Sequence, residues 1–245
     1  MIHQSLSRLE ELKTQALVLM ETAGYPITGE IGVQLEQDLP FMGYTTEKDG
    51  KPIIVVSGMA MTNQGALNLL IHELSHIYRI QTQHPSHNVS LLTSITSWVM
   101  SGQQQMPFQD QILSAILNNI QDIYADDISF SIFAKSKTTK NLDEFFMGWI
   151  REPVKEETLE DVWENAQKLL NAAFAEANLT RHKFPDKDNK VKKAITKFLE
   201  ACDKPMATKY PFFKEFFIKL PQDVTDKEFE SLLISYLNEF RKLVS

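Results

Sequence analysis

Residues 62–81 read TNQGALNLLIHELSHIYRIQ, and this stretch decides how the rest of the chain is interpreted. Its apolar residues recur at helical spacing, which predicts a helix over 62–81 with Thr62 as the residue type that caps helix N-termini. One face of this helix holds Leu67, Leu70, Ile71, Leu74, Ile77 and Tyr78. The two histidines point away from that face, and Leu69 and Ile80 flank them. We therefore expect a helix that is covered on both sides.

Residues 72–76 of this helix, His-Glu-Leu-Ser-His, form an HExxH motif. Histidines at positions i and i+4 lie one turn apart on one helix face, close enough for both imidazoles to bind one zinc ion. Glu73 is then placed to take the proton from a water bound to that metal. The motif arises by chance in roughly one such sequence in a hundred. It therefore predicts a zinc site with His72 and His76 as ligands and Glu73 as general base.

A zinc site with two histidines needs a third protein ligand if one position is to stay open for catalysis. The extended pattern with a third histidine fails, because Arg79 and Thr82 occupy its glycine and histidine positions. Downstream, a predicted helix over 108–134 carries Asp122 and Asp126 at i and i+4, on the side opposite its apolar face. A solvated acidic helix face would explain these two residues about equally well.

The HELSH motif, followed about fifty residues later by Asp122-Ile123-Tyr124-Ala125-Asp126, resembles the zincin metallopeptidases. It is most similar to the gluzincin type, including the minimal gluzincins. In that clan the third ligand is usually a glutamate on a downstream helix, and an Asp one turn later supports a ligand histidine. The resemblance implies one zinc ion held by His72, His76 and Asp122, with Asp126 as the partner of a histidine. It extends over residues 1–135 as an arrangement.

This chain departs from the gluzincin pattern, because it has an aspartate where the third ligand is usually a glutamate. Aspartate is shorter by one methylene group. Either the two helices approach more closely, or Asp126 or Asp127 is the ligand, or the site is weakened. Asp127 lies nearer the apolar face of its helix, where an unpaired carboxylate would be costly. The nearby residues able to donate to an oxyanion are Tyr78, Arg79, His84 and His87.

The elements around the motif predict an α+β fold with a zincin-like core. It begins with an amphipathic helix over 5–23 that ends at Gly24. Short apolar runs with a turn at residues 48–50 then predict a small antiparallel sheet of two or three strands. Its clearest strand is Ile53–Val56, in the position where zincins have the edge strand that aligns substrate. Helices over 62–81, 88–100 and 108–134 complete the core.

The composition changes after Lys135, where blocks of acidic and then basic residues follow. We therefore predict a zincin-like metallopeptidase domain over 1–140 and a mostly helical C-terminal region over 141–245. Helical patterns in that region cover 159–177, 190–201 and 226–244. The basic block, residues 181–197, is interpreted as a solvated face.

The overall composition argues against a nucleic-acid-binding protein, a disulfide-bonded protein and a membrane protein. The chain has 245 residues, a net charge of −7 and a pI near 5.4, so we expect no nucleic-acid partner. A single cysteine, Cys202, excludes an intramolecular disulfide and is predicted to be a small buried apolar residue rather than a metal ligand. We expect no membrane span and no secretory signal, and hence a cytoplasmic location.

These observations predict a zinc-dependent peptidase that acts on a peptide or protein through a metal-bound water activated by Glu73. The alternative is a zincin-like binding or regulatory module with little or no catalytic activity. The aspartate in place of glutamate and the charged C-terminal region favour that alternative. A third interpretation is a purely structural helical protein in which the HExxH motif is accidental.

Overall fold

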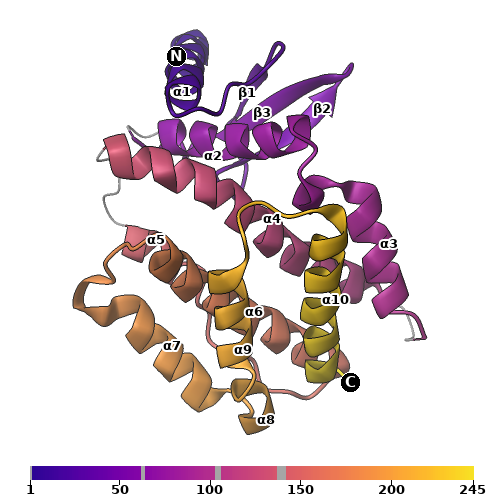
Figure 1. Ribbon diagram of the computed structural model, residues 1–245. Coiled ribbons are helices and arrows are strands. Elements are labelled where there is room, and N and C mark those ends of the chain that lie inside the picture. Colours follow the sequence, from indigo (N-terminus) through magenta and orange to yellow (C-terminus); the bar gives the residue numbers. More distant parts are fainter. Residues whose placement is uncertain (1, 62–63, 103–105, 137–141) are drawn as a thin grey trace. The chain divides into compact units, whose positions relative to one another are not determined.

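The computed structural model describes residues 2–61, 64–102, 106–136 and 142–245, and it has an α+β fold (Figure 1). Contacts group the chain into two compact units, residues 1–87 with 124–139 and residues 88–123 with 140–245. The division passes through the long helix α4 (Pro107–Ser136). The sequence-based domains assigned 88–123 to the first domain, whereas its contacts group it with the C-terminal helices.

The first unit contains a three-stranded sheet and the helices that pack on it. Its elements are α1 (Ile2–Thr22), β1 (Gly32–Glu36), β2 (Gly43–Lys48), β3 (Lys51–Ser57), α2 (Gln64–Gln81), the 3₁₀ turn η1 (Pro85–His87) and the second half of α4. The first helix ends as predicted, because Gly24 has a φ of +94° and Tyr25 N–H donates to Met20 O at 2.9 Å. This is a Schellman motif, which glycine favours.

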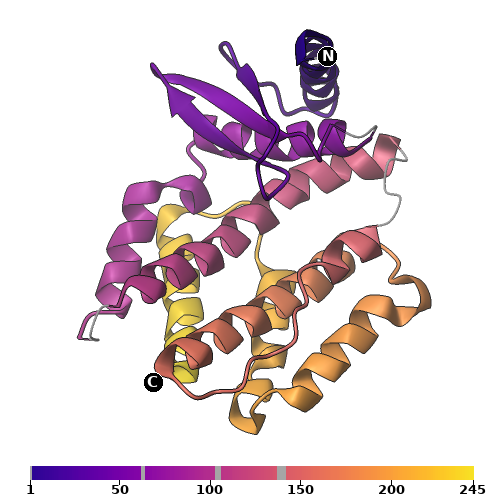
Figure 2. The same cartoon turned by 180° about the vertical axis from the view of Figure 1, so that it is seen from behind.

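The sheet has the strand order β1-β3-β2, so β3 lies in the middle (Figure 1), and Figure 2 shows the same sheet from behind. The strands β2 and β3 form an antiparallel hairpin whose turn residues, Asp49 and Gly50, have φ values of +53° and +75°. In contrast, β1 pairs with β3 in parallel. The prediction of an antiparallel sheet is therefore wrong in part: the hairpin turn determines only one of the two pairings. The predicted strand Ile53–Val56 is central, and the antiparallel edge strand is β2.

Helix α2 packs against the sheet and against α1, and it contacts both β2 and β3. Its predicted apolar face is buried, since Leu67, Leu70, Ile71, Leu74 and Ile77 are all at most 6% exposed. The opposite side is only partly covered, because Ile80 is 54% exposed. Thr62, the predicted cap, lies outside the described residues.

Strand β2 approaches α2 closely at Gly43. A Cβ atom built on Gly43 would lie 2.8 Å from Leu69 Cδ2 and 2.4 Å from the backbone oxygen of Val55. A residue with a side chain does not fit here unless β2 moves away from its neighbours. The missing side chain at Gly43 therefore determines how near β2 comes to the helix that carries the HExxH motif.

We expect Gly43→Ala to lower the free energy of unfolding by about 1–3 kcal/mol, because the added methyl group overpacks the junction of β2, β3 and α2. The measurement is urea denaturation followed by circular dichroism. Lys48→Ala on the exposed end of the same strand is the control, with an expected change below about 0.5 kcal/mol. If the two substitutions change the free energy of unfolding equally, the strand has room for a side chain at Gly43 and the prediction is wrong.

The second unit is helical in its described part. Its elements are α3 (Val89–Val99), the first half of α4, α5 (Leu142–Met147), α6 (Leu159–Arg181), η2 (Lys187–Asn189), α7 (Lys190–Ala201), α8 (Lys204–Ala207), α9 (Tyr210–Lys219) and α10 (Asp226–Leu243). The three predicted C-terminal helices are confirmed within a few residues, while α5 and α8 were not predicted. Across the described ranges, no helix is both long and apolar enough to cross a membrane.

Candidate metal centre

Helix α2 places His72 and His76 one turn apart, with their rings in contact edge to face. Their Nε2 atoms lie 3.1 Å apart, and the two ring planes are inclined by 83°. Two nitrogen ligands of a tetrahedral zinc ion, with bonds of about 2.0–2.1 Å, lie about 3.3 Å apart. The inner nitrogens of this pair are therefore spaced as two ligands of one ion would be.

The outer nitrogen of His72 is held by Asp126 on α4. Asp126 Oδ1 lies 3.0 Å from His72 Nδ1, and Ser129 Oγ donates to the same oxygen at 3.4 Å. An ionised carboxylate only accepts hydrogen bonds, so the contact requires the His72 proton on Nδ1. Neutral His72 then has a lone pair on Nε2, which is the form that binds a metal.

The outer nitrogen of His76 meets a histidine that the sequence analysis placed in a loop. His76 Nδ1 lies 2.8 Å from His87 Nε2. Burial, together with the nearby His76 and His84, lowers the pKa of His87 to about 2. His87 is therefore a neutral imidazole at physiological pH. Its other nitrogen, Nδ1, lies 2.8 Å from Ser86 Oγ.

Residues 84–87 return toward His76 because α2 ends in a tight turn. Gln83 has a φ of +54°, and His84 N–H donates to Arg79 O at 2.8 Å, which are the features of a Schellman motif. Pro85 follows and cannot continue the helix. The side chains of His84, Ser86 and His87 are consequently buried, at most 9% exposed, although they lie between two helices.

The third predicted ligand, Asp122, lies on α4 one turn before Asp126 and is half-buried. One ligand atom from each of His72, His76 and Asp122 lies within 4.8 Å of the other two. Among the described residues, these three side chains form the one group that is large enough and close enough to hold a metal ion. Asp126 contacts the outer nitrogen of His72, and the buried Asp127 is not in the group. Which aspartate is a ligand stays a prediction.

Glu73, the predicted general base, is buried beside the two histidines and contacts the edge strand. Thr45 Oγ1 on β2 donates to Glu73 Oε2 at 2.7 Å. Thr45 was not predicted as a site residue, because a threonine 28 residues before Glu73 carries no local signal. The hydrogen bond from Thr45 holds Oε2 in place. Because the carboxylate is planar and rigid, that hydrogen bond also restricts the position of Oε1.

Three of the four predicted oxyanion donors are buried and contact other groups. Arg79 Nε donates to Tyr124 O at 3.2 Å, and its guanidinium lies 5.7 Å from the centre of the Tyr124 ring. The His84 ring packs against the same ring at 4.6 Å, and His87 contacts His76. Tyr78 is half-buried and meets Tyr25 edge-on. None of these contacts identifies an oxyanion donor.

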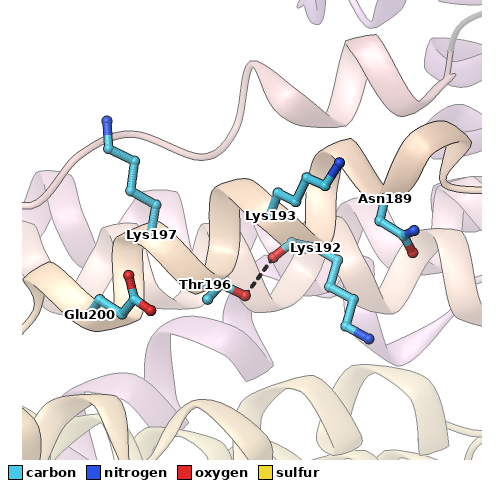
Figure 3. A pocket seen from close by; sticks show the side chains of 6 residues that line it. All are labelled: Asn189, Lys192, Lys193, Thr196, Lys197 and Glu200. Carbon is cyan, nitrogen blue, oxygen red and sulfur yellow. Dashed lines mark hydrogen bonds between the residues drawn. The ribbon is translucent and has the colours of Figure 1, made fainter.

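A shallow depression lies on α7 in the second unit (Figure 3). It is lined by Asn189, Lys192, Lys193, Thr196, Lys197 and Glu200. All six residues are exposed and lie on one helix or at its start, and Thr196 Oγ1 donates to Lys192 O within that helix at 2.9 Å. In the same basic block, Lys190 pairs with Glu144 and Lys197 with Glu152. These features describe a solvated, ion-paired helix face.

Cys202 follows α7 and is 7% exposed. Burial raises the pKa of its thiol to about 11. The thiol therefore stays protonated at neutral pH, whereas a metal ligand must be a thiolate.

A family model described as a family of unknown function (DUF5781) matches residues 12–242 of the chain. No curated protein and no solved structure matches it. The matched range includes His72, Glu73, His76 and Asp122.

Proposed function

The chain belongs to this family of unknown function, and from the geometry of the site we propose that it is a zinc-dependent peptidase. In this proposal His72, His76 and Asp122 hold one zinc ion, and Glu73 is the general base. The helix α1, the mixed sheet, α2 and α4 would form a zincin-like core. The substrate would be a peptide or protein, and the location would be the cytoplasm.

The observation that carries the proposal is the convergence of the two inner histidine nitrogens. His72 Nδ1 contacts Asp126 and His76 Nδ1 contacts His87, and the two Nε2 atoms lie 3.1 Å apart, close to the spacing of two zinc ligands. A hydrogen bond between these two atoms would need a proton on one of them, whereas a zinc ion would bind a lone pair from each. A carboxylate within 4.8 Å adds an oxygen to the two nitrogens. Two histidines and a carboxylate are a donor set that zinc takes in catalytic sites.

When bound, zinc would act as a Lewis acid on the substrate carbonyl and lower the pKa of a water molecule. Glu73 would accept the proton of the attacking water and return it to the leaving amine. Thr45 holds one oxygen of Glu73 and so keeps the carboxylate oriented during both transfers. Asp126 and His87 hold the outer nitrogens of the two histidines.

The edge strand β2 is the proposed support for substrate. In the described chain β2 pairs with β3 on one side only, so its other edge can pair with an extended peptide. Thr45 lies on this strand and contacts Glu73, which would bring a paired peptide bond near the general base. The role that the sequence analysis gave to Ile53–Val56 therefore passes to β2.

The test of this proposal begins with metal analysis of protein purified without added zinc. We expect about one zinc per chain and hydrolysis of unfolded casein that 1,10-phenanthroline abolishes and added zinc restores. The isomer 1,7-phenanthroline, which does not chelate, is the control and should leave hydrolysis unchanged.

Two other outcomes would contradict the proposal. Absence of zinc, even after careful addition of the metal, would mean that the HExxH motif is accidental. Zinc without hydrolysis of casein or of varied peptides would instead favour the binding or regulatory module.

A further inference from the structure

A chain of short contacts leads from His76 through three buried side chains of residues 84–87. His76 Nδ1 lies 2.8 Å from His87 Nε2, and His87 Nδ1 lies 2.8 Å from Ser86 Oγ. Ser86 Oγ in turn lies 2.8 Å from His84 Nδ1. Each ring nitrogen can donate or accept, depending on its tautomer. The direction of the whole chain therefore depends on one fixed point.

The fixed point is a backbone amide, which can only donate. Ser86 N–H donates to His84 Nδ1 at 3.3 Å, so this nitrogen carries a lone pair and no proton. Ser86 O–H must then donate to His84 Nδ1 as well. Because the hydroxyl has a single proton, Ser86 Oγ accepts from His87 Nδ1–H.

The same hydrogen bonds determine which nitrogens of His87 and His76 carry a proton. His87 is buried, and its ring nitrogens contact His76 and Ser86 rather than a carboxylate, which favours the neutral imidazole. With its proton on Nδ1, the neutral His87 has a lone pair on Nε2, which accepts from His76 Nδ1–H. His76 then has its lone pair on Nε2, toward His72. The backbone of η1 thus selects the tautomer of a side chain on α2.

We propose that His87 is a positioning residue, oriented by Ser86 and His84, that holds His76 in the tautomer whose Nε2 binds the metal. The inference rests on the proposed metal centre. Asp126 does the same for His72 through a carboxylate, so the two histidines are oriented by different chemical groups. A neutral imidazole adds no negative charge near the zinc, whereas a second carboxylate would.

The test compares two substitutions of His87. His87→Leu removes the acceptor, and we expect zinc affinity to fall by about 10–100-fold, measured by competition with a chromophoric chelator. His87→Gln places an amide oxygen near the position of Nε2 and should recover most of the affinity. His182→Leu, a histidine in the second unit, is the matched control and should bind zinc as the wild type does. Equal losses in the Leu and Gln variants, with both folded, would overturn the inference.

A second measurement does not depend on zinc or on any variant being stable. Two-bond ¹H–¹⁵N NMR spectra of the metal-free wild-type protein report which nitrogen of His76 carries the proton. We expect the proton on Nδ1, and we expect His87→Leu to add the Nε2–H form. If wild-type His76 carries its proton on Nε2, the inference is wrong even if the protein binds zinc. If the protein binds no zinc but His76 is protonated on Nδ1, the metal site fails and the hydrogen-bond chain stands.

Discussion

Glu73→Gln is expected to retain its zinc and to lose nearly all peptide hydrolysis, with kcat reduced by about 10²–10⁴-fold. The substitution keeps the size of the side chain, and its amide oxygen can still accept the hydrogen bond from Thr45 Oγ1. An amide cannot take a proton from water at neutral pH, so the step that Glu73 performs is removed. The measurements are zinc content and the rate of casein hydrolysis in the same preparation.

Glu21→Gln is the matched control, because it is the same chemical change at an exposed residue of α1, outside the metal centre and the proposed substrate strand. Its hydrolysis rate and zinc content should equal those of the wild type. If Glu73→Gln keeps most of its activity, Glu73 is not the general base. If it loses zinc as well, the role of Glu73 lies in building the site.

The second large effect is expected for the three proposed ligands. His72→Ala, His76→Ala and Asp122→Ala should each weaken zinc binding by about 10³-fold or more and abolish hydrolysis. A complete zinc site contributes roughly 10–16 kcal/mol, so each of its few ligands carries several kcal/mol. Zinc affinity is measured by chelator competition, with circular dichroism to show that the variants fold.

The aspartates of α4 supply the comparison that decides the ligand. Asp126→Ala removes the acceptor from His72 Nδ1 but no proposed ligand, so a loss of about 10–100-fold is expected. If Asp122→Ala binds zinc normally while Asp126→Ala or Asp127→Ala does not, the ligand assignment on α4 is wrong.

The helices around the site were predictable because their signals are local. Periodic apolar residues predicted α2 and α4 within a few residues, and Gly24 ends α1 as expected. The turn at Asp49 and Gly50 predicted the hairpin of β2 and β3. The parallel pairing of β1 with β3 was not predictable in this way, because β2 lies between them in the sequence and no turn joins them directly.

The placement of His72, Glu73 and His76 on one turn of helix follows from the motif alone, since the backbone geometry of a helix brings i and i+4 together whatever surrounds it. The contacts of Asp126 with His72, of Thr45 with Glu73 and of His87 with His76 depend instead on how the elements pack. Each of these contacts joins two elements, and the packing of those elements depends on many side chains at once. The Schellman turn after α2 illustrates the difference, because Gln83 takes a positive φ that glycine usually supplies. No local pattern there predicts that His87 turns back toward the helix it has just left.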